Sequence, residues 1–156
     1  MKYQVAIIDD DAVLCNVVQA VLKSNFDNIN VTIFNNPVVV PSLDIYFIDN
    51  QFDGESVIME LVNKIRDMNP NALIIAMSGT LDYETLEILM NNGCNAVWNK
   101  SWNKGREDVI NIIKEYMDTL ERANEEYCKG VKGTFKSLAD LLSQWNDRLK
   151  KTYGSK

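Results

Sequence analysis

The chain contains no histidine, and this absence excludes several kinds of chemistry at once. Without an imidazole, the chain cannot build a Ser-His-Asp triad, a Cys-His nucleophile pair or a histidine-ligated metal centre. It also cannot carry a phosphoryl group on a histidine of its own.

Cysteine is scarce and its pattern is uninformative. Cys15, Cys94 and Cys128 are odd in number, widely spaced, and include no C-x-x-C pair. This pattern argues against a disulfide framework and against a zinc site. We interpret the three thiols as buried or inert.

Long apolar runs are also missing. No stretch approaches the roughly 20 residues that a membrane-spanning helix needs, and the apolar run near the N-terminus is cut off by Asp9, Asp10 and Asp11. We therefore expect neither a membrane helix nor a secretory signal, and predict a cytoplasmic protein. The 156 residues, 46% of them apolar, suit one hydrophobic core with an appendage.

Charge is unevenly distributed along the chain, whose net charge is −6. Residues 1–120 hold 8 basic and 17 acidic side chains, whereas residues 121–156 hold 8 basic and 5 acidic ones. Direct nucleic-acid binding depends on contacts from basic groups to phosphates. The acidic body therefore argues against nucleic acid as a direct partner, and the mild basic excess of the tail is typical of a solvated helix face.

Several short apolar runs, rich in β-branched and aromatic residues, each end in a polar side chain. Segments of helical periodicity follow most of these runs, which is the pattern of βα units around a parallel sheet. Because such sheets bind ligands outside the carboxyl ends of their strands, we expect the polar ends to meet at one edge. Carboxylates there favour a divalent cation and a lysine favours an anion, which together indicate phosphoryl chemistry. The polar ends are Asp9 to Asp11, Asp49, Ser78 and Lys100.

The connections between these strands contain clear helix signals. Asp11 is placed to cap a helix that begins just after it, and Asp53-Gly54 is interpreted as the cap of another. A third helix, from Leu81 to Met90, ends at the C-terminal signal of Gly93. After a strand around residues 31–33, two prolines at 37 and 41 limit the expected crossover helix to a turn or two.

The C-terminal part shows apolar residues about every 3.5 positions from Val109 to Tyr127, longer than a compact domain requires. After Gly130 and Gly133, Thr134 is placed to cap a further helix with an apolar face. This seam can dock back on its own domain or pair with a second copy in a helical bundle. We favour pairing and predict a homodimer through the C-terminal helices.

Over residues 1 to about 120 the chain resembles the receiver domain of two-component response regulators, the CheY-like family. The resemblance implies a flavodoxin-like, doubly wound α/β fold with a five-stranded parallel sheet in the order 2-1-3-4-5. In this chain we expect the second helix to be shortened, and residues 121–156 to form a helical extension that continues the last helix and adds one further helix. The matching positions are the acidic pair Asp9 and Asp10, the phosphoacceptor Asp49, the hydroxyl residue Ser78 followed by Gly79, and Lys100.

By the same resemblance, Asp49 is a carboxylate nucleophile that becomes an acyl phosphate. Mg²⁺ is the implied cofactor, held by Asp10, Asp49 and the backbone carbonyl of Gln51, with Asp9 acting directly or through water. The chemistry is self-catalysed phosphoryl transfer and autodephosphorylation, so the chain is not expected to be a turnover enzyme.

The resemblance also assigns the signalling parts. Lys100 offers a positive charge to the phosphoryl oxygens, and the hydroxyl of Ser78 moves toward them as the switch. Gln51 and Thr80 flank the attacking water and tune the phosphoryl lifetime. The implied partners are a sensor histidine kinase or phosphotransfer protein, and a downstream protein that reads the face formed by the helix over 81–90, the strand over 96–98 and the helix from 105.

Three departures from the family pattern stand out. The loop from Asp49 to Gly54 is shorter than usual and lacks Met-Pro, and Ser101 replaces the proline that normally follows the lysine. Val97 stands where the switch aromatic is expected, and Trp98 beside it should face the opposite side of the sheet because strand side chains alternate.

These departures keep a second function open, a receiver-like interaction or dimerisation module that does not switch by phosphorylation. A haloacid-dehalogenase-type hydrolase is disfavoured because Asn50-Gln51, and not a second aspartate, follow the nucleophile. A flavin-binding protein is disfavoured because acids occupy the first βα turn, where a phosphate-binding loop would lie.

Overall fold

The computed structural model describes residues 2–79, 83–100, 105–128, 142–145 and 147. Its centre is a five-stranded parallel sheet in the order β2-β1-β3-β6-β7. This order confirms the predicted doubly wound α/β fold. Among the described residues, none of the helices combines the length and the apolar character that crossing a membrane requires. The strands are β1 (Tyr3–Ile8), β2 (Ile29–Phe34), β3 (Ile45–Asp49), β6 (Leu73–Ser78) and β7 (Ala96–Asn99).

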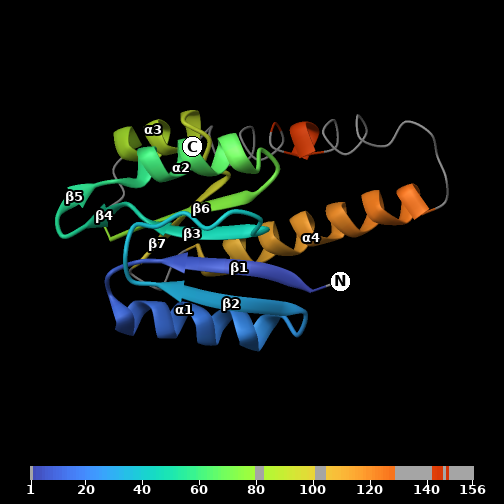
Figure 1. Cartoon of the computed structure of the whole chain (residues 1–156), viewed down its shortest axis with the longest axis horizontal. Coiled ribbons are helices and arrows are strands. Elements are labelled where there is room, and N and C mark those ends of the chain that lie inside the picture. The colour runs from blue at the N-terminus through green and yellow to red at the C-terminus, as the bar shows by residue number, and fades with distance from the viewer. Residues whose placement is uncertain (1, 80–82, 101–104, 129–141, 146, 148–156) are drawn as a thin grey trace.

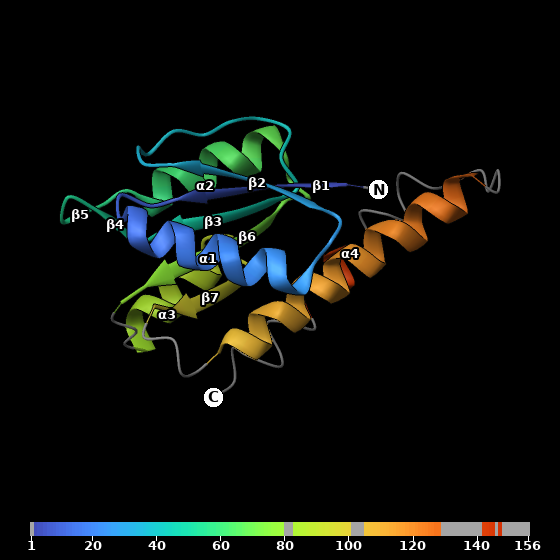
Figure 2. The same ribbon diagram turned by 90° about the horizontal axis from the view of Figure 1, so that it is seen from below.

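Helices cover both faces of this sheet (Figure 1, Figure 2). Helices α1 (Ala12–Asn25) and α4 (Arg106–Cys128) pack on one face, and α2 (Ile58–Met68) and α3 (Tyr83–Asn91) lie over the other. Alternate strand residues serve the two faces, so that Ile7 and Phe47 join the α1/α4 core whereas Ile8 and Ile48 join the α2 core. Every residue of β3 and β6 is buried, as expected for central strands of a parallel sheet.

The crossover from β2 to β3 contains no helical turn, so the predicted shortening of this helix is complete. Residues 35–44 instead form a loop, whose Val39 and Leu43 pack against the same core as α2. The fully buried Tyr46 of β3 holds this loop in place. Its hydroxyl donates to the carbonyl of Val40 (2.6 Å) and accepts from the N–H of Leu43 (3.3 Å). A pinned loop thus covers the area that a crossover helix would cover.

The segment after β3 contradicts the interpretation of Asp53-Gly54 as a helix cap. Residues Gln51–Phe52 (β4) and Glu55–Ser56 (β5) pair antiparallel, and the two residues between them have φ angles of 50° and 83°. Two consecutive left-handed residues make a type I′ turn, for which Asp-Gly is a preferred sequence. A capping aspartate would need extended backbone. Helix α2 begins only at Ile58, without a side-chain cap.

The C-terminal extension is partly described and docks on its own chain. Helix α4 runs 23 residues to Cys128, and beyond it Leu142 and Trp145 are buried in the α1/α4 core. The Trp145 ring lies 5.7 Å from that of Tyr116, and its indole N–H donates to Glu115 Oε2 (3.3 Å). The described part of the extension therefore packs against its own domain, which is one of the two arrangements that the sequence left open. Pairing with a second copy stays a prediction, and the expected cap at Thr134 lies outside the described residues.

Replacing Tyr46 by Phe tests the loop pin. The variant loses both hydrogen bonds to residues 40 and 43 but keeps the ring, so the free energy of unfolding should fall by about 1–2 kcal/mol. Amide exchange gives a local readout, because the Leu43 N–H loses its acceptor whereas the Asp44 N–H keeps its bond to the Gln4 carbonyl. Faster exchange at 43 with unchanged exchange at 44 is expected. Equal exchange at 43 in both proteins would contradict the pin.

Candidate functional site

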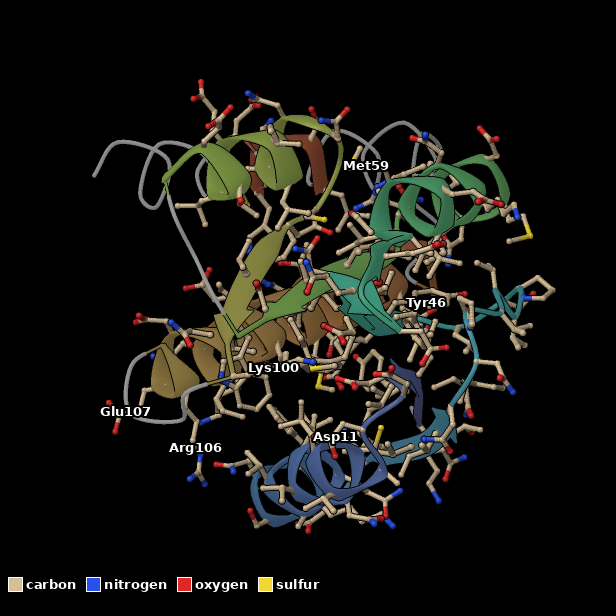
Figure 3. All side chains as sticks on the ribbon, turned by 90° about the vertical axis from the view of Figure 1, so that its left-hand side faces the viewer. Asp11, Tyr46, Met59, Lys100, Arg106 and Glu107 are labelled. Atoms are coloured by element: carbon tan, nitrogen blue, oxygen red, sulfur yellow. The ribbon has the colours of Figure 1, made fainter. Side chains whose placement is uncertain are left out.

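Three strand ends are joined by one lysine. Lys100 Nζ lies 2.9 Å from Asp9 Oδ2 and 2.8 Å from Asp49 Oδ1. Asp9 follows β1, Asp49 ends β3 and Lys100 follows β7, so the carboxyl ends of the strands bring these side chains together, as predicted. Figure 3 looks onto this edge of the sheet, with Lys100 near its centre and Asp11 at the start of α1.

Asp9 is fully buried and closely held. Its Oδ1 accepts the N–H of Asp11 (2.9 Å), and its backbone carbonyl accepts from the Asn35 side-chain amide (3.1 Å) and the Cys15 thiol (3.5 Å). Its Oδ2 meets the Lys100 ammonium but accepts no well-aligned hydrogen bond from the described residues. One oxygen of a buried carboxylate therefore still lacks a well-directed partner.

Asp11 caps α1, as predicted. Its Oδ1 accepts the N–H groups of Val13 (2.9 Å) and Leu14 (3.0 Å), two of the donors that a helix start leaves unsatisfied. This cap fixes the turn between β1 and α1. Because Asp9 and Asp10 lie at this turn, the cap also fixes where their backbone leaves the sheet.

Asp10 is exposed and completes an acidic cluster. Asp9, Asp10 and Asp49 each offer one oxygen, and these oxygens lie within 4.8 Å of one another. The residues fit a hard divalent cation such as Mg²⁺, because the donors are carboxylate oxygens and the buried Asp9 Oδ2 has no well-directed hydrogen bond. The backbone carbonyl of Gln51 was predicted as a further ligand. Gln51 begins β4 shortly after Asp49, and its side chain is exposed.

Burial controls the electrostatics of the cluster. It raises the pKa of Asp49 above 3.8, and the negative charge of Asp9 raises that pKa further, against the opposing effects of Lys100 and of the Gln51 backbone hydrogen bond. Burial also acts against the Lys100 ammonium, but its close contacts with the Asp49 and Asp9 carboxylates leave its pKa raised. Two of the three carboxylates, Asp9 and Asp49, thus share one ammonium, and a bound divalent cation would relieve the excess negative charge of the cluster.

Ser78 and the residues of β7 complete the edge. Ser78 is buried at the end of β6, and its carbonyl accepts the Lys100 N–H (2.8 Å), which places the two residues side by side. Val97 packs toward the α2 core, while Trp98 is buried on the other face with its ring 5.8 Å from that of Phe47. This confirms the predicted alternation. Thr80 lies outside the described residues.

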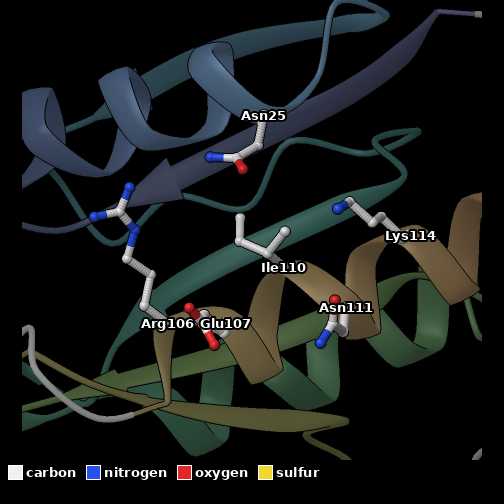
Figure 4. Close-up of a pocket in the computed structure, with 6 residues that line it drawn as sticks. All are labelled: Asn25, Arg106, Glu107, Ile110, Asn111 and Lys114. Atoms are coloured by element: carbon white, nitrogen blue, oxygen red, sulfur yellow. The ribbon is translucent and has the colours of Figure 1, made fainter.

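A separate groove of about 540 Å³ lies between α1 and α4 (Figure 4). Two cations, one carboxylate and two amides surround it over a single buried apolar residue. None of its residues belongs to the acidic cluster, so the groove is not part of the candidate site. It is lined by Asn25, Arg106, Glu107, Ile110, Asn111 and Lys114.

Two contacts at the site were not predicted from the sequence. The N–H of Asp53 donates to Asp10 Oδ2 (3.1 Å), and the amide of Asn35 holds the Asp9 carbonyl. Asn35 directly follows β2 and so lies at the same sheet edge as the other strand ends, which is a signal the sequence does carry. The Asp53 contact depends on the hairpin, for which the Asp-Gly pair was the available signal.

No family model and no curated protein matches this chain. Solved structures do match it. The BeF3-activated DrrB receiver domain superimposes with a TM-score of 0.65 at 18% identity, covering 76% of this chain and 99% of that one. A CheY-like receiver domain protein from Methanospirillum hungatei gives 0.64 at 21%, covering 78% and 98%. The chain has the fold of response-regulator receiver domains.

The chain spans about half the length of another structure that it matches. Against the response regulator DrrB, a Thermotoga maritima OmpR/PhoB homologue, the TM-score is 0.63 at 18% identity, covering 76% of this chain and 54% of that one. The receiver fold therefore accounts for most of this chain. At these identities the likeness concerns the fold, and the roles of individual side chains have to be argued from the site itself.

Replacing Asp49 by Asn tests the excess charge of the site. A carboxyl with a raised folded-state pKa holds its proton more tightly when folded, so its contribution to stability is lost as the pH rises from 3.8 through the folded-state pKa. A tenfold tighter hold on the proton is worth about 1.4 kcal/mol. In buffer without divalent cations, Asp49→Asn should therefore be more stable than wild type near neutral pH, and this advantage should shrink as the pH approaches 3.8.

Urea unfolding of both proteins at several pH values in this range gives the measurement. A saturating concentration of Mg²⁺ provides the control, because the cation should stabilise wild type more than the variant. A variant that is less stable than wild type at neutral pH without Mg²⁺ would contradict the charge argument.

Proposed function

We propose that this chain is a phosphoacceptor signalling domain that receives a phosphoryl group on Asp49 in a Mg²⁺-dependent reaction. The observation that carries the proposal is the position of Lys100 Nζ, within 3 Å of both Asp9 and Asp49, with the Asp10 carboxylate in the same cluster. This arrangement supports the proposal, because a carboxylate that could act as nucleophile, a positive charge and two further carboxylates lie at one sheet edge. Positioning and charge neutralisation are the main requirements of phosphoryl transfer.

The residues take complementary roles in this transfer. A carboxylate oxygen of Asp49 attacks the phosphorus of the donor, the bond from phosphorus to the donor breaks with its electron pair, and an acyl phosphate remains on Asp49. Lys100 neutralises charge on the phosphoryl oxygens, and the adjacent Ser78 offers a hydroxyl to the product. Asp9, Asp10, Asp49 and the carbonyl of Gln51 would hold Mg²⁺, which neutralises further charge when bound.

The phosphoryl donor has to lie outside the sequence of this chain. Because this chain has no histidine, a histidine-linked phosphoryl group has to come from a partner, which we propose is a sensor histidine kinase or phosphotransfer protein. One structural neighbour is described as a BeF3-activated receiver domain, which is consistent with this proposal. The output is relayed by contacts with a downstream protein, and the domain is a self-catalysed substrate in the cytoplasm rather than a turnover enzyme.

A non-switching interaction module is the second candidate. Val97 favours it, because a small side chain packs toward the α2 core where receivers carry the switch aromatic. In such a module the fold and the docked extension would present a partner surface without any change at Asp49. The two candidates differ in a single measurable property, the formation of an acyl phosphate.

Treatment with acetyl phosphate and Mg²⁺, followed by intact-mass spectrometry, distinguishes them. Wild type should gain the mass of one phosphoryl group, and Asp49→Asn should gain none. Asp27→Asn, which removes an exposed acid outside the cluster, serves as the matched control and should react like wild type. Modification that survives in Asp49→Asn would reject Asp49 as acceptor, and unmodified wild type would favour the interaction module.

A further inference from the structure

We propose that the β4–β5 hairpin is a positioning element for the cation site, and that it acts through the backbone N–H of Asp53. This inference rests on the proposed function and adds to it the part of the chain that sets cation affinity. The contact that carries it is the 3.1 Å hydrogen bond from the Asp53 N–H to Asp10 Oδ2. It joins the turn of the hairpin to the one exposed carboxylate of the acidic cluster.

The hairpin is anchored to the domain through its first strand, β4. Asn50, just before it, donates its N–H to the Met77 carbonyl (2.8 Å), which continues the pairing of β3 with β6. Phe52 is only 5% exposed and packs in the α2 core with Ile58. The pairing of Gln51 with Ser56 and of Phe52 with Glu55 closes the turn. The Asp53 N–H is therefore held in a fixed place relative to β3, whose last residue is Asp49.

In both Asp9 and Asp10, one oxygen of the carboxylate accepts a hydrogen bond from a backbone N–H. Asp9 uses Oδ1 to accept the N–H of Asp11, and Asp10 uses Oδ2 to accept the N–H of Asp53. Asp10 thus keeps its Oδ1 for a cation, whereas the second oxygen of Asp9, Oδ2, lies 2.9 Å from Lys100 Nζ. Metal-binding carboxylates are commonly held in this way by a hydrogen bond from the protein, and removing such a partner typically lowers metal affinity 10- to 100-fold.

The need for a holding group is greater for Asp10 than for Asp9. Asp9 is fully buried and packed, so its side chain has little freedom, whereas Asp10 is exposed and would otherwise sample several rotamers. A cation would then have to order Asp10 as it binds, which costs conformational entropy. The hairpin removes part of that cost in advance. Because Asp53 lies four residues after Asp49, the same short segment fixes the positions of both the proposed phosphoacceptor, Asp49, and the Asp10 carboxylate.

Gly54→Ala tests this inference, with Gly105→Ala as its matched control. Both glycines have left-handed φ angles, 83° and 89°, and at both an added Cβ would meet nothing within 4 Å. Both variants therefore introduce the same kind of backbone strain, but only the first strains the turn that carries the Asp53 N–H. Mg²⁺ affinity by titration calorimetry should fall about tenfold in Gly54→Ala. The change in Gly105→Ala should stay within about twofold of wild type.

Asp53→Gly separates the backbone from the side chain. This variant keeps the N–H and suits a left-handed turn position, but it removes the carboxylate. Its Mg²⁺ affinity should stay close to that of wild type. An equal loss in Asp53→Gly and Gly54→Ala would overturn the inference, because the carboxylate would then be the active group. Unchanged affinity in Gly54→Ala would overturn it as well.

Hydrogen exchange on wild type provides a test that does not depend on a variant folding. The Asp53 amide should be protected both without and with Mg²⁺, and an amide that becomes unprotected when the cation binds would overturn the inference. Failure of the proposed function looks different. In that case wild type either binds no Mg²⁺ or binds it without forming an acyl phosphate on Asp49, whatever the variants do.

Discussion

The ion pairs of Lys100 with Asp9 and Asp49 are the constraint on which the rest of the site depends. Two carboxylates that are almost wholly removed from water are costly to bury, and a shared ammonium only partly repays that cost. The pKa of Asp49 is raised because the nearby Lys100 charge does not fully offset the cost of burying this carboxylate. Apolar side chains at these strand ends would serve stability better, so we infer that the charges are kept for chemistry.

The sheet supports this site by holding three strand ends in register. Asp49 pairs opposite Met77 and Ser78 pairs opposite Asn99, so the ladder itself sets the separation of the functional residues. Both faces must be covered for the central strands to stay buried. On one face α1 and α4 do this, and on the other α2 and α3 are supplemented by the loop that Tyr46 pins. The loop thus replaces a helix without exposing β1 and β3.

The strand ends could be predicted from the sequence because they depend on local rules. Short apolar runs that close in polar residues define parallel strands, and the topology of such a sheet brings Asp9, Asp49 and Lys100 to one edge. The capping role of Asp11 follows from its place before a helical pattern in the same way. In each case the residues that matter lie at the boundary of an element, where the pattern is clearest.

The remaining features depend on alternatives that a single sequence leaves open. Asp53-Gly54 suits both a helix cap and a type I′ turn, and the choice depends on Phe52, whose burial draws the segment onto the sheet before α2 begins. The loop over 35–44 is held by Tyr46, and no local pattern reveals that pairing. The docking of Trp145 on Tyr116 likewise joins residues 29 positions apart.

The same geometry suggests how a covalent change at Asp49 would reach the rest of the domain. Lys100 is shared between Asp9 and Asp49, so phosphorylation of Asp49 would convert one of its partners from a carboxylate into an acyl phosphate with more negative charge. The ammonium would then be drawn further from Asp9, which is fully buried and tied to Asn35 and Asp11. Because the backbone N–H of Lys100 donates to the Ser78 carbonyl, a movement of Lys100 would also pull on the end of β6. We propose that Lys100 couples Asp49 to Ser78 in this way, which would let a receiver fold with a small residue at 97 transmit a signal.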